Sequence, residues 1–452
     1  MDKQIAFFNG IDARTGNYYN SPMMLVDLPS MFSATLNDKK HVVFLRKFIE
    51  YLKKPRLGTI FGIDPANIDQ SGWGVIFHHT ESLLVRESMS GMIKYRNGKI
   101  FEYFDGETKD SWLRRHGISP GSVDPNRVPY YLLIVGEPSH IPFEFQYQLD
   151  VQYAVGRLNF DNPKDYEIYT QSVIEHETSE NLFLPKNFVV IGTSHPGDCA
   201  TETSVEYLAK PVVEKVQMQT GWDCLPFLKK DATKRNILDL LSKNQNYSLI
   251  FSACHGLGFQ LGDKDQLRFQ GAWICQDWPG KGAVRNEHVL SGEDIQNFQL
   301  SGKVFFNFSC FGAGTPCRDD FSVIRRQIAP YSFTASLPKK LLSSPNGSAL
   351  AYIGHVDRAW GYSFLWDDID AQPQTLISTL SRILTGTRIG HALSEINIRY
   401  AELSTMLLDT LYNHEYKKTV PDAILHQAQL WVACNDSRNY VLLGDPAVLL
   451  TK

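Results

Sequence analysis

A thiol and an imidazole each stand at the end of a strand-like segment of this chain. Residues 247–256 read YSLIFSACHG and deliver His255, while residues 303–314 read KVFFNFSCFGAG and deliver Cys310. Both segments are short runs of apolar and β-favouring residues that end in glycines typical of a turn. In a parallel α/β sheet, the C-terminal ends of neighbouring strands form the crevice where ligands bind. We therefore expect the two side chains to meet, although they lie 55 residues apart in sequence.

A cysteine beside a histidine is typical of nucleophilic attack on a carbonyl. The thiolate is the attacking species, so a neighbouring imidazole must first take the thiol proton and later return it to the leaving amine. The peptide N–H groups of Gly256 and Cys310 are candidates for an oxyanion hole, in which one donor lowers the barrier by about 3–4 kcal/mol. The pattern predicts a hydrolase with Cys310 as nucleophile and His255 as general base and acid.

Two other cysteines near these positions have simpler interpretations. Cys254 precedes His255 directly, and the alternation of side chains along a strand turns it to the opposite face, into the core. Cys317 follows a Thr-Pro step after the Cys310 strand and is expected in a loop.

Further reactive side chains occur outside this pair. His355 and Asp357 follow another apolar segment and are candidates to line the same cleft. His195 and Cys199 have a spacing that a metal site can use, but without a second pair a metal ion is not expected.

Strands and helices alternate along the second half of the chain. Strand-like segments are expected at 188–192, 247–255, 303–310 and 348–356, separated by helical segments at 202–219, 231–241, 292–298, 376–386 and 388–411. Pro211 is expected to kink or split the first of these helices. The first half offers strands at 74–78, 99–104 and 130–135, and a helix from Asn162 to about Glu177. The pattern predicts an α/β fold with a largely parallel sheet flanked by helices.

Composition narrows the class of protein. Of the 452 residues, 43% are hydrophobic, which is ample for a large core, and 45 basic residues nearly balance 49 acidic ones. That balance gives no general attraction to nucleic acid or to an anionic membrane. The seven cysteines are scattered, without a C-x-x-C pair, as expected in a reducing cytoplasm. Neither a signal-peptide pattern nor an apolar run of membrane-spanning length is present, so a cytoplasmic location is expected.

The motifs resemble those of caspase-fold cysteine peptidases of clan CD, in particular the gingipain and CHAT-like families. The His-Gly step at 255–256, the Ser-Cys step at 309–310 and the lead-in GEDIQNFQLSGKVFFNFSC are similar to the paired strand-end motifs of these families. Upstream, YYLLIVGEPSHIPFEFQYQLDVQYAVGRLNF resembles the first gingipain subdomain, and NYVLLGDPAVLL resembles the closing strand. The similarity extends from about residue 130 to the end.

This resemblance implies a caspase-like architecture of two subdomains, which we place at residues 1–180 and 181–452. It also implies an endopeptidase that needs no redox or organic cofactor and that cleaves partner proteins after Arg or Lys. By motif position, Asp150 would hold the basic side chain, Trp360 would form a pocket wall, and Glu137 would orient His255 as a third catalytic member.

The gingipains are secreted with export signals, whereas this sequence shows none, which brings it closer to CHAT-like proteases of bacterial defence or regulated cell death. A cytoplasmic protease endangers its own cell, so we expect control by cleavage, a ligand or an activating or inhibitory protein partner. The first 130 residues, which match no motif, are the expected place for that control.

Two other functions compete with this one. The chain would be a catalytically silent scaffold of the same fold if Cys310 were unreactive. A nucleotide- or nucleic-acid-binding regulator is disfavoured by the charge balance and because HGLGFQLGDK after Cys254 matches neither phosphate-binding glycine pattern.

Overall fold

A largely parallel sheet forms the centre of the computed structural model. The structure describes residues 5–6, 8–20, 22–24, 27, 58–119, 121–179, 185–242, 247–322, 325–366, 371–416 and 421–451. Ten strands pair in the order β5 (Lys99–Tyr103), β4 (Trp73–His78), β6 (Tyr131–Val135), β7 (Ala154–Leu158), β18 (Tyr440–Gly444), β17 (Ala351–His355), β14 (Val304–Phe308), β10 (Leu249–Ala253), β8 (Asn187–Gly192) and β9 (Asp223–Leu228).

All neighbours in this sheet are parallel except β17 and β18, which run antiparallel. The α/β class and the largely parallel sheet predicted from the sequence are therefore confirmed. The strands of the two predicted subdomains join through the pair β7–β18, at Leu443 and Arg157, so one sheet extends through both. The boundary between residues 180 and 181 stays a prediction.

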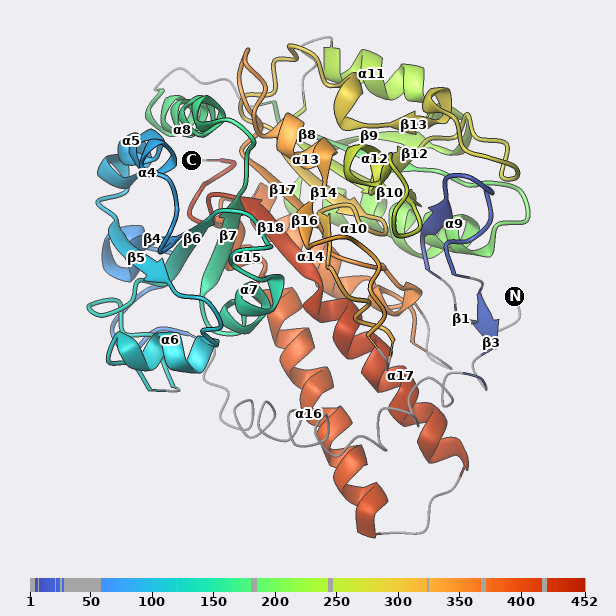
Figure 1. Cartoon of the computed structure of the whole chain (residues 1–452). Coiled ribbons are helices and arrows are strands. Elements are labelled where there is room, and N and C mark those ends of the chain that lie inside the picture. Colours follow the sequence, from blue (N-terminus) through green and yellow to red (C-terminus); the bar gives the residue numbers. More distant parts are fainter. Residues whose placement is uncertain are drawn as a thin grey trace.

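Helices pack on this sheet, and the two longest form a hairpin that projects from it. The α-helices of the described residues are α3 (Ile68–Ser71), α4 (Leu83–Ser88), α5 (Ser90–Tyr95), α6 (Lys109–Arg115), α7 (Phe143–Asp150), α8 (Pro163–Thr178), α9 (Cys199–Ser204), α10 (Lys210–Thr220), α11 (Lys234–Ser242), α12 (Gln266–Phe269), α13 (Ser336–Leu341), α14 (Gln374–Leu384), α15 (Ile389–Ala392), α16 (Ser394–Tyr416) and α17 (Pro421–Arg438). Figure 1 shows α16 and α17 side by side, extending well beyond the strands.

The interruption expected at Pro211 takes the form of a wider helical turn. A π-helical turn at Val205–Ala209 joins α9 to α10, and Pro211 lies in the first turn of α10. The first turn of a helix suits proline, because proline lacks the N–H group that a residue in the helix interior donates. The helix expected at 292–298 is reduced to the single 3₁₀ turn Gly292–Asp294.

A second, smaller sheet brings the beginning of the chain to the end of β10. Its strands pair in the order β13 (Val289–Leu290), β12 (Trp273–Ile274), β11 (His255–Gly258) and β2 (Gly10–Asp12). Strand β2 runs parallel to β11, with Gly10 opposite Gly256. We call residues 8–20 the N-terminal segment, and it packs beside α9 in the second half of the molecule (Figure 1).

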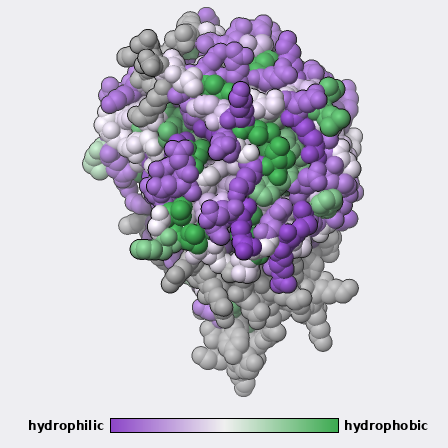
Figure 2. All heavy atoms as spheres, turned by 90° about the vertical axis from the view of Figure 1, so that its left-hand side faces the viewer, coloured by the Kyte–Doolittle hydropathy of each residue, from purple (hydrophilic) through white to green (hydrophobic). Residues whose placement is uncertain are grey.

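The surface beside β5 is mostly polar. Figure 2 shows this face with apolar side chains in small groups among hydrophilic ones, as expected for the surface of a globular protein. In the part of the chain that the structure describes, no helix combines the length and the apolar character needed to cross a membrane.

Candidate active site

Cys310 and His255 occupy equivalent places on two neighbouring strands. Strands β10 and β14 are parallel and in register, with Ala253 opposite Phe308, and each reactive residue comes two positions after its member of this pair. Both side chains are fully buried. The two turns touch directly, because a β-carbon placed on Gly256 would lie 1.8 Å from the carbonyl oxygen of Cys310. Only glycine fits at position 256 beside the nucleophile.

The imidazole of His255 is held by Asp198, a residue that the sequence reasoning did not select. The distance from Nε2 of His255 to Oδ2 of Asp198 is 2.5 Å, and Asp198 also caps the N-terminus of α9 by accepting from the backbone N–H of Ala200. Strand β8 pairs with β10, so the loop after Gly192 lies beside the loop after Ala253. This pairing places Asp198 against His255.

Several contacts keep the carboxylate of Asp198 charged. Burial opposes the charged form, but the charge and hydrogen bond of His255 and the hydroxyl donors of Tyr18 and Thr201 outweigh it and hold the pKa of Asp198 well below its usual range. A carboxylate that accepts from Nε2–H leaves the Nδ1 lone pair of His255 free. Nδ1 is buried and has no hydrogen-bond partner among the described residues, so its lone pair is available for a general base to accept a proton.

Aromatic rings enclose the imidazole of His255. Tyr18 meets it edge-on, with centroids 5.6 Å apart, and His195 stacks on it at 6.4 Å. Trp278 packs against both imidazoles. Burial first, and then the neighbouring His255, lower the pKa of His195 to about 4, so His195 stays neutral and leaves the proton chemistry to His255.

The two backbone amides predicted to form the oxyanion hole point at one oxygen. The N–H of Gly256 donates to the carbonyl oxygen of Asn9 at 2.8 Å, and the N–H of Cys310 donates to the same oxygen at 3.1 Å. Asn9 belongs to the N-terminal segment, which matches no motif and was expected from the sequence only as part of a region that controls the enzyme. Two convergent N–H donors beside a nucleophile are the arrangement that stabilises a developing oxyanion.

The thiol of Cys310 is closed off from solvent in this arrangement. Its sulfur accepts from the backbone N–H of Ala359 at 3.3 Å. Burial is the main cause that raises the pKa of the Cys310 thiol far above its ordinary value, against the opposing effects of the Ala359 hydrogen bond and Arg358. The turn after the nucleophile is fixed by Phe311, which has φ of 59° and donates its N–H to the carbonyl oxygen of Asp357 at 2.6 Å.

The side-chain hydrogen bonds of Glu137 and Asp150, two residues selected by family resemblance, do not involve Cys310 or His255. The carboxylate of Glu137 accepts from the hydroxyl of Ser139, at 3.2 Å, and Asp198 stands where Glu137 was expected, against the imidazole. Asp150 ends α7 and accepts from the backbone N–H of Val155 at 3.3 Å. Both roles were assigned from sequence position alone, and they stay predictions.

Trp360 lies close to the site. Its ring packs against Phe8 of the N-terminal segment with centroids 5.1 Å apart, and its backbone N–H donates to the carboxylate of Asp436 at 2.8 Å. The role of Trp360 as a pocket wall stays a prediction.

The remaining reactive side chains have structural partners. Cys254 is buried, and burial raises the pKa of its thiol to about 12. Cys317 donates to the carbonyl oxygen of Ala329 in a loop. His355 is buried against Asp436, while Asp357 supports the nucleophile turn as described above.

A possible set of metal ligands occurs elsewhere in the described residues. The ligand atoms of His78, His79 and Asp105 lie within 4.8 Å of one another. These residues lie at or just after the ends of β4 and β5, far along the sheet from β10 and β14. His195 and Cys199 are not part of this group.

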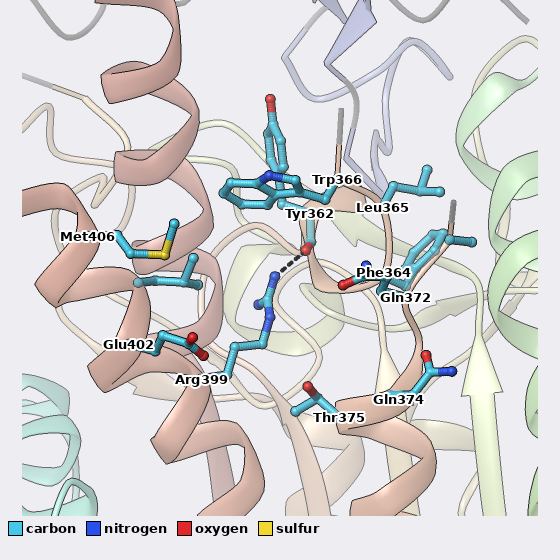
Figure 3. A pocket seen from close by; sticks show the side chains of 12 residues that line it. Tyr362, Phe364, Leu365, Trp366, Gln372, Gln374, Thr375, Arg399, Glu402 and Met406 are labelled. Atoms are coloured by element: carbon cyan, nitrogen blue, oxygen red, sulfur yellow. Dashed lines mark hydrogen bonds between the residues drawn. The ribbon is translucent and has the colours of Figure 1, made fainter. Parts of the chain in front are cut away.

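A surface pocket on the second half does not contain the reactive pair. It lies between the loop after Trp360 and helix α16, and Figure 3 shows Arg399 at its centre with Glu402 beside it and Trp366 opposite. Arg399 donates to the carbonyl oxygen of Tyr362 at 2.5 Å. Because neither Cys310 nor His255 lines it, this pocket is not the catalytic cleft.

Solved structures of other proteins resemble this fold. A solved structure described as "Structure of Protease" is 12% identical, with a TM-score of 0.50, and the match covers 85% of this chain and 79% of that one. The complex of Porphyromonas gingivalis RgpB pro- and mature domains is 13% identical, with a TM-score of 0.46 and coverage of 84% and 79%. At 12% identity, the first of these structures indicates a similar fold and nothing about activity. Among the curated proteins, none matches this chain.

A family model matches most of the chain. The model for peptidase family C25, the gingipain family of clan CD, matches residues 120–451, which confirms the gingipain resemblance. The likeness to CHAT proteases stays a prediction. Since the match includes both strand-end motifs and far more than half of the sequence, the chain belongs to peptidase family C25, a family of cysteine endopeptidases.

Proposed function

We propose that the chain cleaves peptide bonds with Cys310 as nucleophile, His255 as general base and acid, and Asp198 as the residue that orients the imidazole. The observation that carries this proposal is the convergence of the Gly256 and Cys310 amides on one carbonyl oxygen, beside a thiol and an imidazole that is held by a carboxylate.

The proposed reaction follows from these positions. His255 takes the Cys310 proton at Nδ1, and the sulfur bonds to the carbonyl carbon while the two amides stabilise the oxyanion. The C–N bond then breaks as the imidazolium protonates the leaving amine. Water, deprotonated by His255, cleaves the thioester and releases the new carboxylate and the thiol. Asp198 keeps its negative charge beside the imidazolium in each step.

Cleavage after Arg or Lys is the specificity that the family resemblance implies. It depended on Asp150, whose hydrogen bond to Val155 gives no reason to place it at the site. A cytoplasmic location, a role in bacterial defence or cell death, and a regulatory protein partner also rest on resemblance alone and stay predictions.

Cleavage of a mixed peptide library, read by mass spectrometry, tests this function. Wild type should produce cuts that Cys310→Ala does not, and Cys317→Ala is the matched control because it removes a loop thiol outside the cluster. Equal cutting by wild type and Cys310→Ala would refute the assignment. A Cys310 that resists thiol electrophiles in folded protein would favour the silent scaffold.

A further inference from the structure

The N-terminal segment lies in the active site in the direction that a substrate would take. Asn9 places its carbonyl oxygen between the amides of Gly256 and Cys310, and its N–H donates to the carbonyl oxygen of Ala359 at 3.1 Å. One residue earlier, Phe8 bridges Trp360 in antiparallel fashion. An extended chain that adds to a sheet edge in this way is a common mode of peptide recognition.

The bond after Asn9 lies against the thiol. A β-carbon placed on Gly10 would be 3.0 Å from Sγ of Cys310 and 3.1 Å from its Cβ, so glycine allows this close approach without any shift of the thiol. After Gly10, the segment continues as β2 along β11, with Ala13 donating to the carbonyl oxygen of Gly258. The backbone on both sides of the Asn9–Gly10 bond is therefore bound, with the nucleophile between them.

The side chain of Asn9 enters a small polar pocket on helix α9. Its Nδ2 donates to the hydroxyl oxygen of Ser204 at 3.0 Å, and the Ser204 hydroxyl in turn donates to the carbonyl oxygen of Ala200 at 2.8 Å. Because that proton is already engaged, Ser204 offers only a lone pair to the pocket. An amide N–H can donate to this lone pair. A carboxylate of the same size would instead place an oxygen acceptor against the Ser204 oxygen, with no proton between them.

The burial of Asn9 also argues against a long basic side chain in this position. Asn9 is only 1% exposed, and its Oδ1 is buried without a partner among the described residues. A lysine or arginine would need several more ångströms and a negative charge at the end of the pocket. The short side chain of Asn9 already reaches the helix.

We propose that the Asn9–Gly10 bond is the first substrate of this enzyme, and that the pocket at Ser204 selects asparagine as the residue before the cleaved bond. This inference rests on the proposed cysteine endopeptidase function and deepens it. Until the bond is cut or the segment leaves, the carbonyl of Asn9 excludes any other substrate carbonyl from the two amide donors.

The self-cleavage consumes one water and needs no other reactant. The sulfur of Cys310 bonds to the carbonyl carbon of Asn9, the bond to the Gly10 nitrogen breaks, and His255 gives that nitrogen a proton. Water then hydrolyses the thioester, which leaves a carboxylate on Asn9, an amine on Gly10 and a free thiol. The part that begins at Gly10 keeps its strand pairing with β11, while the fragment that ends at Asn9 is free to depart.

The test is to incubate the purified full chain and follow its N-terminus by intact mass and sequencing. Wild type should yield a chain that begins at Gly10, and Cys310→Ala should not. Asn9→Ala should slow the cut by about 100-fold, because the Ser204 acceptor is left unpaired. Asn17→Ala, an exposed asparagine of the same segment, is the matched control and should cleave like wild type.

A synthetic peptide with the sequence QIAFFNGIDAR separates folding effects from specificity. Wild type should cut it between Asn and Gly, and the same peptide with Asp in place of Asn should be cut about 100-fold more slowly. Ser204→Ala should reduce the preference for Asn over Asp by about 10-fold, as expected for one hydrogen bond.

The outcomes distinguish this inference from the proposed function. The inference would be overturned if the peptide library showed Cys310-dependent cuts while the Asn9–Gly10 bond stayed intact, or if cuts occurred only after Arg or Lys. Either result would still support the endopeptidase function. The absence of any Cys310-dependent cut in chain, peptide and library would overturn both.

Discussion

Replacing Asp198 by asparagine should abolish most of the activity, because it reverses the tautomer of His255. In the structure, Oδ1 of Asp198 accepts from the Ala200 backbone N–H, and Oδ2 accepts from the Thr201 hydroxyl and from Nε2 of His255. The hydroxyl can rotate, but the backbone N–H cannot. The NH₂ group of an asparagine must therefore take the Oδ2 position and face the imidazole.

An amide that donates to Nε2 forces the imidazole proton onto Nδ1. That nitrogen is the one left free to take the thiol proton, so the base is lost without any loss of packing. Restoring the active tautomer costs the charge-assisted hydrogen bond, about 1.5–3 kcal/mol, and sets two buried donors against each other at about 1–3 kcal/mol. A total of about 4 kcal/mol corresponds to a loss of about a thousandfold in rate.

The assay is kcat/KM for a library-derived peptide as a function of pH, for wild type and Asp198→Asn. Asp165→Asn, in the first turn of α8, is the control for the loss of an acid near a helix N-terminus. Glu137→Gln should have nearly wild-type activity. The tautomer argument would be refuted by an Asp198→Asn enzyme that keeps a tenth of the activity with an unchanged pH profile, or by a thousandfold loss in Glu137→Gln.

Three further predictions follow from the surroundings of the thiol. Phe8→Ala should raise the alkylation rate of Cys310 by about 100-fold, because the loss of about 3 kcal/mol of buried contact favours release of the N-terminal segment. Phe101→Ala, at the far edge of the sheet, is the control, and an equal rise in that variant would contradict this prediction. Burial and the charge of a neighbouring aspartate raise the pKa of Asp357 to about 7, so the folded state keeps a proton that the unfolded chain loses above about pH 4. Between pH 4 and 8 the free energy of unfolding of wild type should therefore fall by up to about 4 kcal/mol more than that of Asp357→Asn. An equal pH dependence of the two proteins in chemical denaturation would contradict this. Gly256→Ala should lower the melting temperature and remove activity, since its β-carbon meets backbone at 1.8 Å, and a fully active variant in the peptide assay would exclude that steric account.

The strand ends were predictable from sequence because their signal is local. An apolar run followed by glycine marks the end of a buried strand, and parallel topology then brings such ends together, so Cys310 and His255 could be paired without a structure. The amide donors followed from the same turns. The family match adds that this is peptidase chemistry.

Asp198 and Asn9 were missed for physical reasons. An aspartate before a helix is an ordinary N-cap, and only the pairing of β8 with β10 turns it toward His255. Asn9-Gly10 has the sequence of a turn, and a strand of three residues has no period that a pattern can detect. Its partner strand lies some 245 positions later, so the contact that decides its conformation is entirely non-local.

The pairing of these strands divides the molecule into parts that should open separately. Strand β10 has five registered pairs on each side, with β8 and β14, whereas β2 has three residues and a single strand neighbour. In a hydrogen-exchange experiment, the amide hydrogens of β10 should exchange only through global unfolding, whereas those of Asp12 and Tyr19 should exchange through local opening. The N-terminal segment and the catalytic framework would then be two cooperative units, so the site can be emptied while the residues that perform the chemistry stay in place.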